Sequence, residues 1–394
     1  MSTPTHRPDG SIHPLPDRVV RLGWGLLLGG LVILAAAYGV DGRRAAFDNV
    51  ILFLFVASLA VGGIFLVALE YISGAVWSVP FRRINEAMGT LTPILPILAL
   101  PMFLHMHDLF HWTHAESVAA DHILQAKSPY LNVSFFVARF AVVIAVWLLF
   151  LVLFTRNSRK QDVTKDQALT TWNVRLSALF LPLFAVTLTV TAVDWAMSLE
   201  PHWFSTIFGV YYFSGTVLAA VSATTLAVVY LMESGHLTGL KRDHLYSLGA
   251  LQFAFINFWA YIAFSQFMLI WYANIPEETY WFMARWKNGW EVVSVLMVVV
   301  HFAVPYFMLL SQDSKMDPRK LKAMSYWILG AHLLDLYWLV MPTYSDTVTV
   351  GWTELGIPLT AAGLMILALA FSMRRVSLVP VGDPKLERAM KFRL

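Results

Sequence analysis

The sequence contains no cysteine and carries very little charge. Without cysteine the chain cannot form disulfides, ligate an iron–sulfur cluster through thiolates or attach a c-type haem covalently. Only 13% of its 394 residues are charged, against about 25% in an average soluble domain, and 58% are hydrophobic. This composition predicts that most of the chain is buried in lipid. Any redox centre must be bound non-covalently or belong to a partner.

The sequence also lacks the motifs of soluble enzymes. We find no P-loop, no dinucleotide-binding fingerprint, no H-E-x-x-H and no G-x-S-x-G, which argues against nucleotide-driven and hydrolytic functions. The net charge of +3 does not indicate nucleic-acid binding, because the basic residues lie in short loops between apolar runs. The polar N-terminus has no A-x-A-like cleavage site after the first apolar run. We therefore expect that run to be retained as a signal anchor.

Apolar runs long enough to cross about 30 Å of hydrocarbon recur along the chain. They lie at roughly 22–40, 50–74, 91–112, 133–154, 174–197, 206–231, 246–272, 290–311, 323–341 and 355–372. We predict an all-α polytopic membrane protein of about ten transmembrane helices. Its expected parts are an N-terminal tail (1–21), a ten-span domain (22–372) and a basic C-terminal tail (373–394). Prolines interrupt the third run, which makes it the least regular.

The loop charges predict the orientation of these spans. Of the 28 lysines and arginines, 22 lie in the two tails and in alternate loops, and 5 lie in the opposite set of loops. Arg139 falls inside a span. Because cytoplasmic loops carry the excess of lysine and arginine, both termini are expected in the cytoplasm.

Histidines gather at the outer end of the third run, in the segment HMHDLFHWTHAES (105–117). His107, His111 and His114 follow i, i+4, i+7 spacing, which places them on one face of a helix. Asp108 and His105 lie beside them. Such a stripe could bind a metal, relay protons or hydrogen-bond a quinol hydroxyl, or it could be a polar collar at the membrane interface. A b-type haem is disfavoured, because no span carries two histidines about four turns apart.

Acidic residues flank the turn between the fifth and sixth spans. Asp194 lies near the outer end of the fifth span, followed by Glu200 and His202, and Ser205 or Thr206 is expected to cap the sixth helix. Ionisable residues at membrane depth are costly and are functional candidates by default. These groups could release protons to the outside, or they could serve only as a helix cap and dipole partner.

Further polar residues could extend a proton path inward, or could only lock helices together. They are Glu70, Asn257, Tyr261, Gln266, His301, His332, Asp335 and Tyr337. Arg139 must snorkel or find a carboxylate, and Asp108 and Asp194 are the nearest acids by depth.

Three segments carry a resemblance to a known family. The run DWAMSLEPHWFSTIFGVYYFSG (194–215), with EYISGAVWSVPFRRINE (70–86) and HMHDLFHW (105–112), resembles the NrfD/polysulfide-reductase membrane subunits. It is most similar to the shorter of the two NrfD-like subunits of bacterial alternative complex III. The resemblance implies a pair of four-helix bundles with peripheral helices in the bacterial inner membrane. It also implies quinol oxidation near the outer side by the whole complex.

In such a complex the partners would be a paralogous NrfD-like membrane subunit, an iron–sulfur subunit, haem c subunits and lipids. No cofactor would be bound covalently, and the ligand would be menaquinol or another quinol. The chain itself could bind quinol, or could conduct protons and serve as a scaffold. The candidate residues for proton or quinol handling are His107, Asp108, His111, His114, Arg139, Asp194, Glu200, His202, Glu70, His301, His332 and Asp335. The alternatives are a proton-coupled secondary transporter and a purely scaffolding membrane subunit.

Overall fold

The computed structural model describes residues 11–394, of which most are helical and none lies in a β-strand. Within this part of the chain, nine helical segments are long and apolar enough to cross a membrane. Five of them are single helices: α1 (Asp17–Val40), α2 (Gly42–Ser73), α8 (Val133–Thr164), α10 (Phe208–Glu233) and α11 (Arg242–Ala273). Two include a 3₁₀ turn, namely α9 (Ala168–Trp195), which is extended to Leu199, and α17 (Gly356–Met373), which is preceded by a turn from Thr353. The other two are Val79–Leu104, which contains α3 (Arg82–Gly89) and α4 (Leu95–Leu104), and Trp290–Met308, which contains α13 (Trp290–Met297) and α14 (Val304–Met308). The chain is therefore a multi-pass helical membrane protein.

Eight of the ten predicted spans are confirmed as candidate membrane helices, and a ninth, the third, is confirmed with different bounds. The run predicted at 323–341 forms α16 (Pro318–Tyr344), whose 27 residues extend about 40 Å. It is not among the nine, because polar residues such as His332 and Asp335 dilute its hydrophobicity. It nevertheless packs lengthwise against α2 and α10.

The third predicted span has different bounds from those expected. Residues 91–112 do not form one helix. The membrane-length segment begins at Val79 and ends at Leu104, and His105 has a backbone conformation that closes α4. The four-residue helix α5 (Met106–Leu109) and a 3₁₀ turn at His111–Thr113 follow separately. The histidine-rich segment therefore lies beyond the end of the span.

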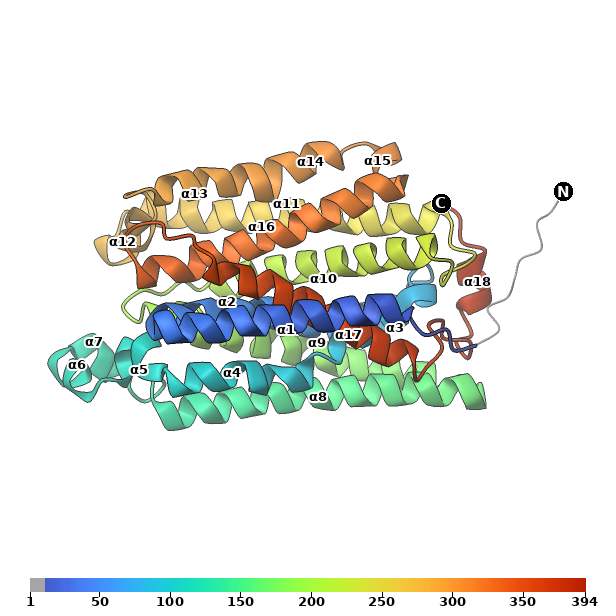
Figure 1. Cartoon of the computed structure of the whole chain (residues 1–394), viewed down its shortest axis with the longest axis horizontal. Helices are drawn as coiled ribbons and strands as arrows, with labels where there is room; N and C mark the ends of the chain where they lie inside the picture. Colours follow the sequence, from blue (N-terminus) through green and yellow to red (C-terminus); the bar gives the residue numbers. More distant parts are fainter. Residues whose placement is uncertain (1–10) are drawn as a thin grey trace.

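The helices pack as two groups joined through α2 and α10. The first group contains α2, α3, α4, α8 and α9, and the second contains α10, α11, α13, α14 and α16 (Figure 1). α1 and α17 pack against each other along the outside of α2 and α3. The arrangement buries α2 along its entire apolar window.

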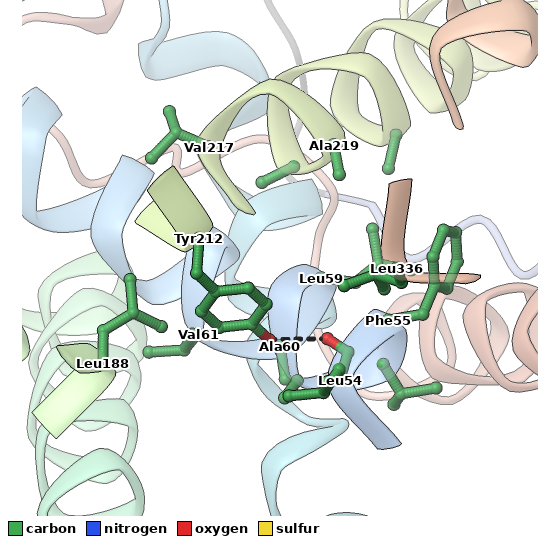
Figure 2. Packing of buried hydrophobic residues seen from close by; sticks show 14 of the residues in the cluster. Leu54, Phe55, Leu59, Ala60, Val61, Leu188, Tyr212, Val217, Ala219 and Leu336 are labelled. Atoms are coloured by element: carbon green, nitrogen blue, oxygen red, sulfur yellow. Dashed lines mark hydrogen bonds between the residues drawn. The ribbon is translucent and has the colours of Figure 1, made fainter. Parts of the chain in front are cut away.

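Close helix contacts around α2 depend on small residues. A Cβ at Gly62 would lie 2.6 Å from the Cβ of Ala220 on α10, so only glycine permits this approach. Figure 2 shows how Tyr212 of α10 reaches across to α2 among buried aliphatic side chains. Its hydroxyl donates a hydrogen bond of 2.8 Å to the carbonyl oxygen of Leu54.

The two ends of the helical domain differ in character. α1 begins at the same end as α18 (Leu386–Met390), whereas α5, α6 (Ala115–Ala120), α7 (His122–Lys127) and α12 (Pro276–Ala284) gather at the opposite end (Figure 1). We call these the α18 end and the α12 end. The short helix α15 (Gln312–Met316) completes the list of helices.

Candidate functional site

The predicted histidine stripe is not a single helical face. Because α5 ends at Leu109 and Phe110 is extended, the i, i+4, i+7 spacing of His107, His111 and His114 does not apply, and that prediction is wrong. Instead the chain folds back, and the rings of His107 and His114 lie 5.0 Å apart between centroids. His105 Nδ1 lies 2.8 Å from an exposed Asp108 carboxylate oxygen. The segment forms an exposed polar lobe at the α12 end.

His202 and Glu200 also lie at the α12 end, but each has its own partner. His202 Nε2 lies 2.5 Å from Oδ2 of Asp121, the residue that caps α7. This contact is the main reason that the pKa of Asp121 is lowered. Glu200 accepts a hydrogen bond of 3.2 Å from the Thr343 hydroxyl. The expected cap at Ser205 or Thr206 is not formed, because α10 begins at Phe208 after an uncapped Ile207.

A cavity of about 250 Å³ opens beside this turn. Tyr130, Met197, Trp203 and Phe204 line it, and its wall is almost entirely apolar. Lys127 reaches over it and donates a hydrogen bond of 2.6 Å to the Pro201 carbonyl. Burial of this amine lowers its pKa.

Arg139 has the carboxylate partner that its position requires. Its guanidinium donates two hydrogen bonds to Asp194, of 2.8 Å from Nε and 2.9 Å from Nη2. The pair joins α8 to α9, and the ring of Tyr130 covers the guanidinium at 3.7 Å. Of the two acids predicted as partners, Asp194 is confirmed. Because both its oxygens are held by arginine, we interpret Asp194 as a structural residue.

Glu70 is likewise part of an ion network rather than an isolated acid. Near the α18 end, Arg82 Nη1 donates to Glu70 at 2.8 Å and to Asp383 of the C-terminal tail at 2.7 Å. All three side chains are buried. Arg83 extends the network to Asp162 at 2.6 Å. These contacts bind the tail after α17 to the ends of α2 and α8.

A second set of polar residues meets in the interior, between α10, α11 and α16. The Asp335 carboxylate accepts a hydrogen bond from the Tyr211 hydroxyl on one oxygen and from Trp259 Nε1, at 3.1 Å, on the other. Asp335 is 2% exposed. No arginine or lysine pairs with this carboxylate within the described residues.

Two histidines adjoin Asp335. Nε2 of His332 lies 3.2 Å from the Ser58 hydroxyl on α2, and Ser58 donates its own proton to the Leu54 carbonyl at 2.9 Å. In the tautomer with the proton on Nε2, Ser58 accepts a hydrogen bond from Nε2–H and a lone pair remains on Nδ1 of His332. His301 stacks on Trp259 with ring centroids 3.8 Å apart.

The ring nitrogens that face this cluster are unsatisfied. Within residues 11–394, Nδ1 of His332 and both ring nitrogens of His301 are buried without a hydrogen-bond partner. One ligand atom each from His301, His332 and Asp335 lies within 4.8 Å of the other two. Buried polar groups normally have partners, so three orphaned nitrogens around one carboxylate mark this cluster as the candidate functional site.

Two backbone features shape this site. A Cβ at Gly215 would lie 3.0 Å from Nδ1 of His332 and 3.6 Å from Asp335 Oδ2. Glycine therefore allows α10 to approach both groups closely. His301 lies on a π-helical turn, Val298–Ala303, between α13 and α14, a distortion that is frequent at functional sites.

Arg285 lies between this cluster and the α12 end. It is fully buried and donates to the backbone carbonyls of Trp281, Trp338 and Leu339 at 2.9–3.2 Å. Burial lowers its pKa to about 9, and it interacts electrostatically with Glu200 and Tyr211. A positive charge thus stands between the central cluster and the acid at the α12 end.

At the central cluster the structure brings together three of the predicted site residues, His301, His332 and Asp335, and elsewhere it pairs Arg139 with Asp194 and His107 with His114. Tyr211, Trp259 and Ser58 complete the site but were not predicted individually. Tyr211 and Gly215 lie within the 194–215 run that carried the resemblance, which is the one signal that pointed to them. Tyr261, singled out on the same helix as Trp259, is 66% exposed on the outside of the domain.

Chemically, the central cluster can accept and hold one proton or one cation. A lone carboxylate with two donors and two imidazoles with free lone pairs forms a proton-exchanging set.

No family model matches the chain, and the search of curated proteins found no significant match.

Proposed function

We propose that this chain is an integral membrane subunit of a quinol:electron-acceptor oxidoreductase complex, and that Asp335 and its neighbours carry protons within it. In this proposal the chain corresponds to the shorter of the two NrfD-like membrane subunits of alternative complex III. Quinol is oxidised near the outer side of a bacterial inner membrane, and electrons pass to iron–sulfur and haem c partner subunits. A paralogous membrane subunit lies beside it.

The helix arrangement supports this assignment. Two helix groups joined through α2 and α10, with α1 and α17 outside them, match the pair of four-helix bundles with peripheral helices that the resemblance implies. In this proposal α16 is the tenth span. An even number of spans agrees with the start of α1 and the position of α18 at one end (Figure 1), which the loop charges assign to the cytoplasm.

The observation that carries the proposal is the buried Tyr211–Asp335–Trp259 set with two adjacent histidines. An intramembrane carboxylate without a cationic partner is energetically costly, which makes it a functional candidate by default. Asp335 can exchange a proton with Tyr211 through their direct hydrogen bond. Arg285 raises the barrier for a cation moving from the α12 end. This arrangement favours controlled proton transfer over an open pore.

The experiment compares Asp335→Asn and Tyr211→Phe in the complex reconstituted into liposomes. Removal of a proton-transfer group typically costs about 10²–10⁴-fold in the step that it serves. We expect quinol-driven turnover to fall at least tenfold when that step limits the rate. Tyr261→Phe, on the exposed face of α11, is the matched control and should be unaffected.

Co-purification tests the subunit assignment separately. The chain should be isolated from membranes with iron–sulfur and haem c subunits, and the two variants should still assemble. Wild-type turnover and proton release in Asp335→Asn would exclude a proton-carrying role. Purification of the chain alone, together with solute uptake in liposomes, would support the transporter instead.

A further inference from the structure

The central cluster has the donor set of a metal site as well as that of a proton carrier. Two imidazoles and one carboxylate converge within 4.8 Å, and the three side chains are 0–2% exposed. A proton carrier needs only one of these groups. The presence of two histidines with unsatisfied ring nitrogens, both beside the same carboxylate, calls for a ligand that accepts several donors at once.

We infer that His301, His332 and Asp335 bind one divalent first-row transition-metal ion, for which Zn²⁺ is the appropriate probe. Two imidazoles and a carboxylate suit Zn²⁺, Fe²⁺ or Co²⁺ far better than Mg²⁺ or Ca²⁺, which select oxygen ligands. Three protein ligands leave an open coordination position, as in catalytic zinc sites.

The geometry permits the ligands to close around an ion. Zinc–nitrogen and zinc–oxygen bonds are about 2.0–2.2 Å, so two ligand atoms on one ion are at most about 4.4 Å apart. The present separations of up to 4.8 Å need only small side-chain rotations. His332 Nδ1 and Asp335 Oδ2 both lie against Gly215 of α10, so these two ligand atoms already face the same point of the backbone.

The surrounding hydrogen bonds are those of a metal site. A histidine ligand usually donates its second ring N–H to a neighbouring acceptor, and a ligating carboxylate is itself hydrogen-bonded. Ser58 fulfils the first role for His332. Tyr211 and Trp259 fulfil the second for Asp335, and each carboxylate oxygen retains a lone pair.

Zn²⁺ binding is measured on the full-length chain in detergent, stripped with a chelator and then titrated with Zn²⁺. Metal content after gel filtration gives the stoichiometry, and ligand-field absorption after Co²⁺ substitution reports the geometry. We expect one tightly held ion in the wild type and its loss in His301→Gln/His332→Gln. Ser58→Ala retains all three ligands and should weaken binding about 10–100-fold.

The exposed histidines at the α12 end provide the matched control. His107→Gln/His114→Gln removes two imidazoles from the surface lobe and should leave the tight ion in place. No tight ion in the wild type, or a tight ion that survives in His301→Gln/His332→Gln, would overturn the inference. Zn²⁺ binding is read without quinol turnover, so its failure is distinguishable from a failure of the proposed proton transfer.

Discussion

Removing either partner of the Arg139–Asp194 pair should destabilise the helical domain strongly, whereas removing both should cost much less. Each single change leaves the other charge buried, since the two side chains are only 8% and 4% exposed. An uncompensated charge of this kind typically costs about 3–5 kcal/mol. In the double variant no charge remains, so mainly the lost packing and hydrogen bonds contribute.

The two single variants should not be equal. In Asp194→Asn the guanidinium keeps its hydrogen bond of 2.7 Å to the Tyr130 carbonyl and its stacking on the Tyr130 ring. A cation–π contact of this kind is worth about 0.5–2 kcal/mol. In Arg139→Gln the Asp194 carboxylate loses both of its charged donors. We therefore expect Arg139→Gln to be the more destabilising.

The assay is a double-mutant cycle on unfolding of the detergent-solubilised protein, with Asp194→Asn, Arg139→Gln and their combination. The exposed pair Lys322–Glu233, with an N–O distance of 2.8 Å, is the matched control. Its coupling energy should be about 0–1 kcal/mol. A coupling energy for Arg139–Asp194 that is no larger than that of this control would refute the reasoning.

Three further outcomes follow from individual contacts. Gly215→Ala should lower the thermal stability, because the new methyl group would lie 3.0 Å from the imidazole of His332. Gly330→Ala, where no other atom lies near the new methyl group, should instead raise the free energy of unfolding by up to about 1 kcal/mol through helix propensity. Asp383→Asn should cost about 1.5–3 kcal/mol, the worth of a hydrogen bond to a charged group, and should expose the C-terminal tail to protease. The lowered pKa of Asp121 means that its carboxylate stabilises the α12 end above the ordinary carboxyl pKa. Stability is lost as pH falls through the lowered value, so the protection of amides near His202, taken relative to the intrinsic exchange rate at each pH, should fall there and should stay constant in Asp121→Asn.

The membrane-spanning segments could be predicted from the sequence because hydrophobic length and loop charge are local properties. The burial of each helix could not be predicted, because a helix that faces protein can be as apolar as one that faces lipid. α2 is enclosed by other helices along its entire apolar window, whereas α8, whose mean hydropathy is nearly the same, has well under half of its apolar window buried. α16 shows the opposite problem, since its polar residues reduce its apparent suitability for the membrane while providing its contacts in the interior.

Only part of the candidate functional site could be predicted from the sequence, for a similar reason. Spacing relates residues on one helix, so His332 and Asp335 could be paired as i, i+3 neighbours. The contributions of Tyr211 and His301 depend on how α10, α16 and the π-helical turn are packed. The histidine stripe failed because spacing was applied across a segment in which the helix ends. For Arg139 the cost of an unpaired charge predicted a carboxylate partner or snorkelling, and depth in the membrane reduced the candidate partners to Asp108 and Asp194.

The ion network at the α18 end has a consequence for how the chain is made. Arg82 follows the second helix, but its partner Asp383 is 301 residues further along the chain. During synthesis this guanidinium has only Glu70 and Glu86 as acidic partners until Asp383 has been made. The buried network at the α18 end therefore closes late, and a chain truncated before Asp383 would leave Arg82 without one of its carboxylate partners.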